Sequence, residues 1–140
     1  MLRKTAQSPP PRRRILIIDN HPLVRRGLTA LINAEPDLIV CAEATNPREG
    51  LEAIGDAQPD LVIVDLSLRH SNGLELVREI RSRHEGLRVL VVTMLEAPQY
   101  VRRAFAAGAN GYVTKKEMTE TLLMAIRRVL RGETYGAPED

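Results

Sequence analysis

The chain has 140 residues, which is enough for one domain with a hydrophobic core of its own. Tryptophan is absent and aromatic residues make up 3% of the chain, so aliphatic side chains must fill that core. The pI of about 9.0 reflects residues 1–14, which carry five basic and no acidic side chains. The remaining residues hold 15 basic and 18 acidic side chains, so the expected folded part is mildly acidic and a broad nucleic-acid-binding surface is not expected there.

Residues 1–13 combine basic residues and a proline triplet with no hydrophobic periodicity, which is typical of a disordered leader. They lack the apolar stretch of a signal peptide, and no segment of the sequence is long and apolar enough to span a membrane. The chain has one cysteine, Cys41, and therefore cannot form an internal disulfide. Cys41 lies in an apolar run and is expected in the core. We therefore expect a cytoplasmic protein.

From residue 14 onward, apolar runs alternate with amphipathic stripes. The apolar runs predict strands at residues 14–18, 37–44, 61–64, 87–93 and 111–114. The stripes predict helices at about residues 20–32, 46–55, 74–80, 97–107 and 119–132.

Local signals set the expected helix details. Asn20 and Asn46, each followed by a proline in the first turn, are expected to cap the first and second helices. In the first helix Arg25 and Arg26 are expected to face water, and in the fourth helix Val101 and Phe105 are expected to be the main anchors.

The run Leu61–Val64 has no polar alternation, which is typical of a strand buried on both faces in the middle of a parallel sheet. Five strands that alternate with five helices through short connections predict an α/β fold with one parallel sheet and helices on both faces. The flavodoxin-like strand order 2-1-3-4-5 is the common solution for a chain of this size.

Polar side chains follow four of the expected strands. Asp19 and Asp65 follow the first and third strands, which are neighbours in this order, and Thr93 and Lys115 stand at the ends of the fourth and fifth. We therefore expect all four to meet in one crevice at the carboxyl edge of the sheet.

Two carboxylates in one crevice repel by about 4 kcal/mol at 4 Å and an effective dielectric of about 20, so the site must contain a cation. Lys115 supplies one positive charge, and Mg2+ suits the oxygen ligands that remain. Asp65 could then act as a nucleophile toward a phosphoryl group, with Lys115 neutralising the phosphoryl oxygens and Thr93 donating a hydrogen bond to them.

Five motifs follow one another along the chain. They are Asp19-Asn20-His21-Pro22-Leu23-Val24-Arg25, Pro59-Asp60-Leu61-Val62-Ile63-Val64-Asp65-Leu66, Asn72-Gly73-Leu74-Glu75, Thr93, and Ala107-Gly108-Ala109-Asn110-Gly111-Tyr112-Val113-Thr114-Lys115. In this order and at this spacing they resemble the receiver domain of bacterial two-component response regulators. The ending Ala125-Ile126-Arg127-Arg128-Val129-Leu130-Arg131-Gly132 and the His-Pro pair after the first strand resemble the NarL/FixJ (LuxR-type) branch, and the similarity spans residues 14–132.

This resemblance implies that a sensor histidine kinase phosphorylates Asp65. It implies a magnesium site formed by Asp19, by residue 20, by Asp65 and by the backbone carbonyl of Ser67. Lys115 and Thr93 would contact the phosphoryl group, and Thr93 and Tyr112 would form the switch. The surface of the fourth helix, fifth strand and fifth helix would then change shape, and activation would favour a homodimer.

The sequence departs from the family pattern at three positions. Asn20 stands where a second acid is usual, which should weaken magnesium binding by about 1 kcal/mol or more. Arg69 stands where a proline is usual, which should loosen that loop. Met94 is larger than the residue common at its position and should narrow the access to Asp65. A pseudo-receiver that works as an interaction or dimerisation module without phosphorylation is therefore an alternative.

Several of these residues also fit other roles. Asn20 could serve only as a helix cap, Tyr112 could be half-buried with its hydroxyl in water, and His21, His70 and His84 lack metal-ligand spacing and are expected in loops or at the surface. A flavodoxin-like cofactor protein or small-molecule enzyme lacks support, because no Gly-rich loop follows the first strand and no aromatic pair could sandwich a flavin. The domain itself is not expected to be an enzyme.

Residues 133–140 resemble the start of a linker. Relatives in this branch carry a C-terminal helix-turn-helix, so we expect DNA binding only through an output domain absent from this chain. We expect the chain to be the receiver fragment of a longer transcription regulator, with a stand-alone receiver as the alternative.

Overall fold

A computed structural model describes residues 11–68 and 72–138. The strands are β1 (Arg13–Ile18), β2 (Leu38–Ala44), β3 (Leu61–Val64), β4 (Arg88–Thr93) and β5 (Gly111–Thr114). The helices are α1 (Pro22–Asn33), α2 (Pro47–Ala57), α3 (Gly73–Arg83), α4 (Pro98–Ala107) and α5 (Met118–Leu130).

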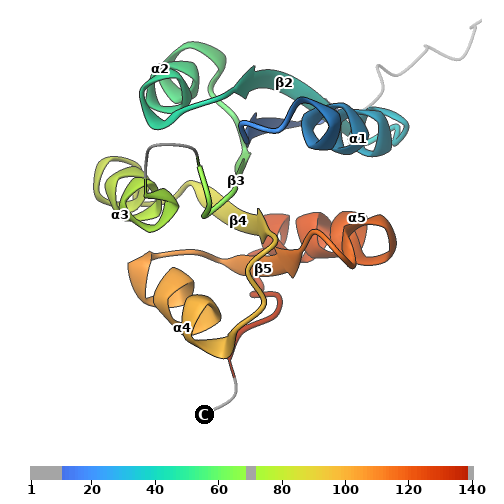
Figure 1. Ribbon diagram of the computed structural model, residues 1–140. Coiled ribbons are helices and arrows are strands. Elements are labelled where there is room, and N and C mark those ends of the chain that lie inside the picture. The colour runs from blue at the N-terminus through green and yellow to red at the C-terminus, as the bar shows by residue number, and fades with distance from the viewer. Residues whose placement is uncertain (1–10, 69–71, 139–140) are drawn as a thin grey trace, which may run out of the picture.

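The strands form one parallel sheet in the order β2-β1-β3-β4-β5, which confirms the predicted flavodoxin-like α/β fold. Helices α1 and α5 cover one face of the sheet, and α2, α3 and α4 cover the other (Figure 1). The register pairs Ile18 with Val64 and Thr93 with Thr114, so β1, β3, β4 and β5 end at the same edge.

The central strand is buried on both faces, as its composition predicts. Val62 and Val64 pack toward α2, α3 and α4, while Leu61 and Ile63 pack toward α1 and α5. Each fully buried aliphatic side chain contributes about 1.5–3 kcal/mol. The two apolar layers on opposite faces of β3 therefore hold the strand end that carries Asp65 in a fixed position.

Of the expected helix details, the cap of α2 is confirmed, the cap of α1 is wrong, and the anchors of α4 are confirmed in part. Asn46 caps α2 by accepting a hydrogen bond from the backbone N–H of Glu49 at 2.9 Å, and α2 continues two residues beyond the predicted end at residue 55. The cap residue of α1 is His21, so Asn20 does not cap it. In α4 the expected anchors Val101 and Phe105 pack against the core although they are only partly buried, and Ala104 and Ala107 are buried in addition.

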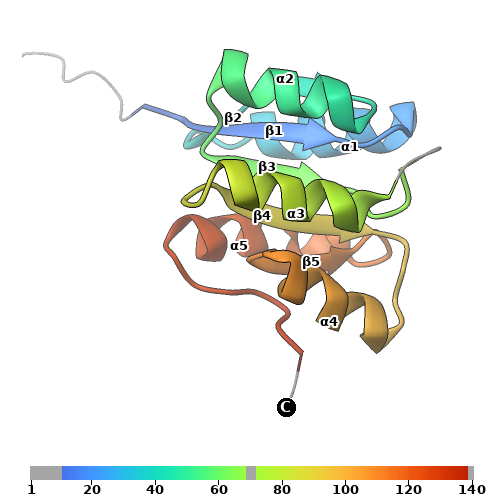
Figure 2. The ribbon, with the colours of Figure 1, turned by 90° about the vertical axis from the view of Figure 1, so that its left-hand side faces the viewer.

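The chain ends depart from the boundaries drawn from the sequence. Strand β1 begins at Arg13, and beyond α5 the chain returns to the sheet, where Tyr135 pairs with Gly111 of β5 (Figure 2). Cys41 lies on the edge strand β2 and is only partly buried, so its expected place in the core is wrong. Arg69 and His70 and most of the leader lie outside the described residues. No helix of the described part combines the length and apolar character that crossing a membrane requires.

Candidate functional site

The four predicted strand-end residues meet at the carboxyl edge of the sheet. Asp19 follows β1, Asp65 follows β3, Thr93 ends β4 and Lys115 follows β5. Asp19 is 1% exposed, Asp65 and Thr93 are 0% exposed, and the Lys115 side chain is 5% exposed. The sheet therefore brings two carboxylates, a hydroxyl and an ammonium into one buried cup.

The ammonium of Lys115 lies between the two carboxylates. Its Nζ atom is 2.8 Å from Asp65 Oδ2 and 2.9 Å from Asp19 Oδ2. Backbone hydrogen bonds fix these positions. The N–H of Lys115 donates to the backbone carbonyl of Thr93 at 2.8 Å, and the N–H of Asp65 donates to the backbone carbonyl of Ile18 at 3.1 Å. A buried cation thus offsets the repulsion between two buried anions.

Asp65 stays ionised although it is buried. Burial alone would raise the pKa of its carboxyl group, but hydrogen bonds from Lys115, from the backbone N–H of Ser67 and from Thr93 together hold the pKa below its ordinary value. Asp65 Oδ1 accepts from both the backbone N–H and the hydroxyl of Ser67, each at 3.0 Å. The site therefore presents an anionic carboxylate at neutral pH, as a nucleophile requires.

Gly73 lets the first turn of α3 approach the end of β3. A Cβ atom at this position would lie 2.4 Å from the Cα of Leu66 and 2.5 Å from the carbonyl oxygen of Asp65. The N–H of Gly73 donates to the carbonyl of Leu66 at 3.2 Å. Only glycine fits this approach, so Gly73 helps to place Asp65.

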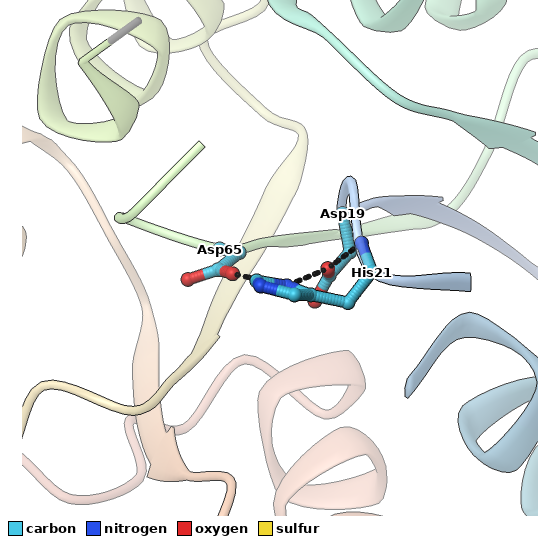
Figure 3. Close-up of side chains that lie close together, drawn as sticks. All are labelled: Asp19, His21 and Asp65. Carbon is cyan, nitrogen blue, oxygen red and sulfur yellow. Dashed lines mark hydrogen bonds and ion pairs between the residues drawn. The ribbon is translucent and has the colours of Figure 1, made fainter. Parts of the chain in front are cut away.

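Sequence reasoning missed His21 as a member of this site. Its backbone N–H donates to Asp19 Oδ1 at 2.8 Å, and its Nδ1 atom lies 2.9 Å from the same oxygen and 3.6 Å from Asp65 Oδ2 (Figure 3). Lys115 Nζ is 3.2 Å from the same Nδ1 atom. The side chain is 50% exposed and forms one wall of the cup. The available signal was its place two residues after Asp19, where a turn folds the ring back over the strand end.

The oxygens that could hold a cation are Asp19 Oδ2, Asn20 Oδ1 and the Asp65 carboxylate. The amide oxygen of Asn20 is buried and has no hydrogen-bond partner among the described residues. Asp19 Oδ2 likewise has no aligned donor there, so its contact with Lys115 is a charge contact rather than a hydrogen bond. Asp19 and Asp65, with His21, also form a group whose ligand atoms lie within 4.8 Å of one another. The carboxylates of Asp19 and Asp65 fit a divalent cation that prefers oxygen ligands.

Arg25 contacts the backbone of Asp19 rather than facing water, so the expectation is wrong for Arg25, whereas Arg26 is exposed as expected. The guanidinium of Arg25 donates to the carbonyl oxygen of Asp19 at 2.7 Å and pairs with Glu43 at 3.3 Å. The backbone of Asp19 is therefore held by α1 as well as by the sheet.

Thr93 and Tyr112 are linked through the loop after β4. Tyr112 is 5% exposed, and its hydroxyl donates to the carbonyl of Leu95 at 2.6 Å, so the half-exposed alternative is wrong. The N–H of Leu95 donates to the Thr93 hydroxyl at 3.5 Å. Burial and the nearby charge of Asp65 raise the pKa of Tyr112 to about 12. Met94, in the same loop, is 63% exposed.

A parallel sheet of order 2-1-3-4-5 with an acid and lysine site at its carboxyl edge defines a doubly wound α/β signalling or binding domain. The model of the response regulator receiver domain matches residues 15–127, so the chain belongs to the response regulator receiver family. A crystal structure of a two-component response regulator of the LuxR family from Aurantimonas sp. SI85-9A1 superposes with a TM-score of 0.86 at 37% identity, covering 91% of each chain.

Curated relatives place the chain in the NarL and LuxR branch. The chain is 32% identical to the nitrate/nitrite response regulator protein homolog of Haemophilus influenzae, covering 86% of this chain and 58% of that protein. It is also 32% identical to the response regulator GacA of Pseudomonas protegens, covering 90% of this chain and 59% of that protein. The chain thus spans about three fifths of the length of these relatives.

Proposed function

We propose that Asp65 accepts a phosphoryl group from a sensor histidine kinase and that the domain passes this signal to an output. The observation that carries the proposal is the position of Lys115 Nζ, within 2.9 Å of both buried carboxylates at the carboxyl edge of the sheet. A lysine that only stabilised the fold would not need two buried acids, because burying such charges is costly.

In the proposed reaction an oxygen of the Asp65 carboxylate forms a bond to phosphorus as the bond from phosphorus to the donor histidine nitrogen breaks. The leaving imidazole keeps the electron pair and takes up a proton from solvent. Lys115 then moves its hydrogen bond from the carboxylate to the phosphoryl oxygens and neutralises part of their charge. Ser67 keeps the acceptor oriented through its two hydrogen bonds to Oδ1.

We propose that Mg2+ binds to Asp19, Asn20 and Asp65, with the backbone carbonyl of Ser67 as a further ligand. When bound, the ion supplies positive charge that stabilises the transferring phosphoryl oxygens. The unpaired, buried amide oxygen of Asn20 supports this assignment within the described residues, because such an oxygen is costly unless a cation or water fills the site.

We propose that the signal spreads from Thr93 through Leu95 to Tyr112 and changes the surface of α4, β5 and α5. A homodimer would form on activation, and the regulated output, DNA binding in relatives of this type, would belong to a part of the protein outside residues 1–140. The contacts of the Tyr112 and Thr93 hydroxyls with Leu95 support this route.

Intact-mass analysis after incubation with acetyl phosphate and magnesium tests the proposal. We expect one phosphoryl group on the wild-type chain and none on Asp65→Asn, which keeps the size of the side chain. Asp56→Asn, on the exposed face of α2, is the matched control and should be phosphorylated like the wild type. A phosphoryl group that persists on Asp65→Asn would overturn the assignment.

A pseudo-receiver remains the second candidate, and the neutral side chain of Asn20 favours it. It predicts no adduct on the wild type with or without magnesium, and the same partner binding or dimerisation for Asp65→Asn as for the wild type. An adduct that forms only after Asn20→Asp would show that the acceptor is intact and that the metal site alone limits the reaction.

A further inference from the structure

The C-terminal segment after α5 occupies a surface that the phosphorylation site alone does not explain. We propose that residues 133–138 form a strap that closes the free edge of β5 and that Tyr112 couples this strap to Thr93 and Asp65. The strap stands on its own contacts, whereas the coupling rests on the proposed function of Asp65.

The strap pairs with β5 as a short additional strand. The N–H of Tyr112 donates to the carbonyl of Tyr135 at 2.9 Å, and the N–H of Tyr135 donates to the carbonyl of Asn110 at 3.1 Å. The bridge between Gly111 and Tyr135 is parallel, like the rest of the sheet. Because β5 is an edge strand, its outward backbone groups would otherwise be open to strand addition by a second chain.

The end of α5 directs the chain onto this edge. Gly132 adopts a φ of +91°, and its N–H and that of Glu133 donate to carbonyls in the last turn of α5 at 3.0 and 3.1 Å. The guanidinium of Arg128 lies over the ring of Tyr135, 5.7 Å from its centroid. Figure 2 shows the segment running from the end of α5 along β5 toward α4.

One glycine, Gly136, is matched to the close approach of strap and strand. A Cβ atom on Gly111 would meet the strap only in ordinary contact, 3.5 Å from the Cβ of Tyr135, and its close contact would be with Leu90 of β4 at 2.7 Å. Gly136 has a φ of +72°, and a Cβ atom there would lie 2.5 Å from the carbonyl oxygen of Tyr112. The strap therefore fits against β5 only because this position carries no side chain.

Tyr112 is the point where the strap and the phosphorylation site meet. Its backbone N–H binds Tyr135 in the strap, while its hydroxyl binds the carbonyl of Leu95 in the loop after β4. Leu95 in turn donates to the hydroxyl of Thr93, and the buried side chain of Thr93 lies beside the carboxylate of Asp65. A displacement of Thr93 that moved Tyr112 would therefore act on the strap, and release of the strap would act back on Thr93.

The far end of the strap reaches α4. Gly136 and Pro138 line a cavity of about 370 Å³ together with Glu96, Pro98, Val101 and Arg102. The strap thus crosses from α5 over β5 to the start of α4 and covers the surface that we propose to change on phosphorylation. Any second copy that paired with the edge of β5 would first have to displace it.

Amide hydrogen exchange of the unphosphorylated chain tests the strap. Gly136→Ala should make the amide of Tyr112 exchange about tenfold faster, because the added methyl group forces the strap away from its carbonyl. Gly86→Ala is the matched control, since a Cβ atom there meets nothing within 4 Å and the amide of Tyr112 should be unaffected. Equal exchange in Gly136→Ala and the wild type, with both proteins folded by circular dichroism, would overturn the strap.

The coupling is tested by repeating the exchange after acetyl phosphate treatment, with the adduct confirmed by intact mass. We expect the exchange of Tyr112 and Tyr135 to change about threefold or more in the wild type and to stay constant in Tyr112→Phe, which lacks the bond to Leu95. An adduct without any change in exchange overturns the coupling but leaves the function of Asp65 intact. Absence of the adduct overturns that function and the coupling with it, while the unphosphorylated exchange still decides the strap.

Discussion

Asn20 would set the charge of the cation site that we propose. An aspartate at this position would add a third carboxylate to Asp19 and Asp65, whereas the amide oxygen would contribute a ligand without that charge. This oxygen is buried without a partner among the described residues, so no hydrogen bond there competes with a cation for it.

We expect Asn20→Asp to bind magnesium about tenfold more tightly than the wild type, because the added anionic oxygen attracts the ion directly. Isothermal titration calorimetry of magnesium measures this without any phosphodonor. Asn33→Asp, at the other end of α1, adds the same charge far from the cup and should leave the affinity unchanged. Equal affinity of Asn20→Asp and the wild type would show that residue 20 does not contact the ion.

Gly73 is the second residue whose replacement tests the site. We expect Gly73→Ala to lower the free energy of unfolding by about 1–3 kcal/mol, since its methyl group would overlap the backbone of Leu66 and Asp65. Gly55→Ala in α2 is the control, because open space surrounds that position and alanine should stabilise the helix by about 0.5–1 kcal/mol. Urea unfolding measures both, and a Gly73→Ala variant as stable as the wild type would contradict the close packing of α3 on β3.

At the scale of elements, β5 and the loop after β4 are joined by the buried hydroxyl of Tyr112. The pKa of Tyr112 is raised from 10.0 to about 12, so the neutral phenol is the form that the fold favours. The stabilisation that the neutral phenol of Tyr112 contributes is complete below pH 10.0, which is the pKa of this group in the unfolded chain. It is lost as the pH rises toward about 12, the pKa in the folded chain.

Spectrophotometric titration should therefore detect one phenol that ionises near pH 12, and this signal should be missing in Tyr112→Phe. Tyr100→Phe is the control, because it removes a different tyrosine and should leave the late-titrating phenol in place. A late signal that survives in Tyr112→Phe would mean that the hydroxyl of residue 112 is not buried.

Helix α5 is fastened to the loop between α1 and β2 by Arg127. Its guanidinium lies 2.6 Å from Glu35 and 2.8 Å from Asp37, and the hydrogen bond from Arg127 lowers the pKa of Asp37. We expect Arg127→Ala to lower the free energy of unfolding by about 1 kcal/mol or less, because the cluster is partly exposed and screened by solvent.

The stability lost in Arg127→Ala should depend on pH, because the pKa of Asp37 is lowered in the folded chain. The pKa of Asp37 lies below 3.8 in the folded chain, so its share of the stabilisation is complete above pH 3.8 and disappears as the pH falls through the lower folded value. Urea unfolding at neutral and acidic pH should show the gap between Arg127→Ala and the wild type narrowing in acid. Arg78→Ala, which breaks only a local pair with Glu75, should show a smaller effect at neutral pH.

For the whole molecule, the sequence could predict the fold and the residues at the strand ends, because both depend on where the strands lie and on their order in the sheet. Asp19, Asp65, Thr93 and Lys115 were found because parallel strands end at one edge, so a residue at a strand end has a known place. His21 and Arg25 were missed because their positions depend on the turn after β1 and on how α1 is rotated against the sheet. Tyr135 was missed because it lies in no periodic segment, and its backbone pairing with β5 depends on the path of the chain after α5.

The boundaries of the domain give the last prediction. The buried core residues of both faces lie between Ile15 and Val129, so we expect a chain that ends at Gly132 to fold. Removal of residues 133–140 would leave the outward N–H of Tyr112 without its partner and expose the edge of β5. We expect the melting temperature to fall by about 4 °C or more, and light scattering to show self-association that increases with protein concentration.

Removal of residues 1–11 is the control and should change neither the melting temperature nor the self-association, because that segment precedes β1. A truncated chain that stays monomeric with an unchanged melting temperature would place the boundary at Gly132 and leave residues 133–138 without a structural role.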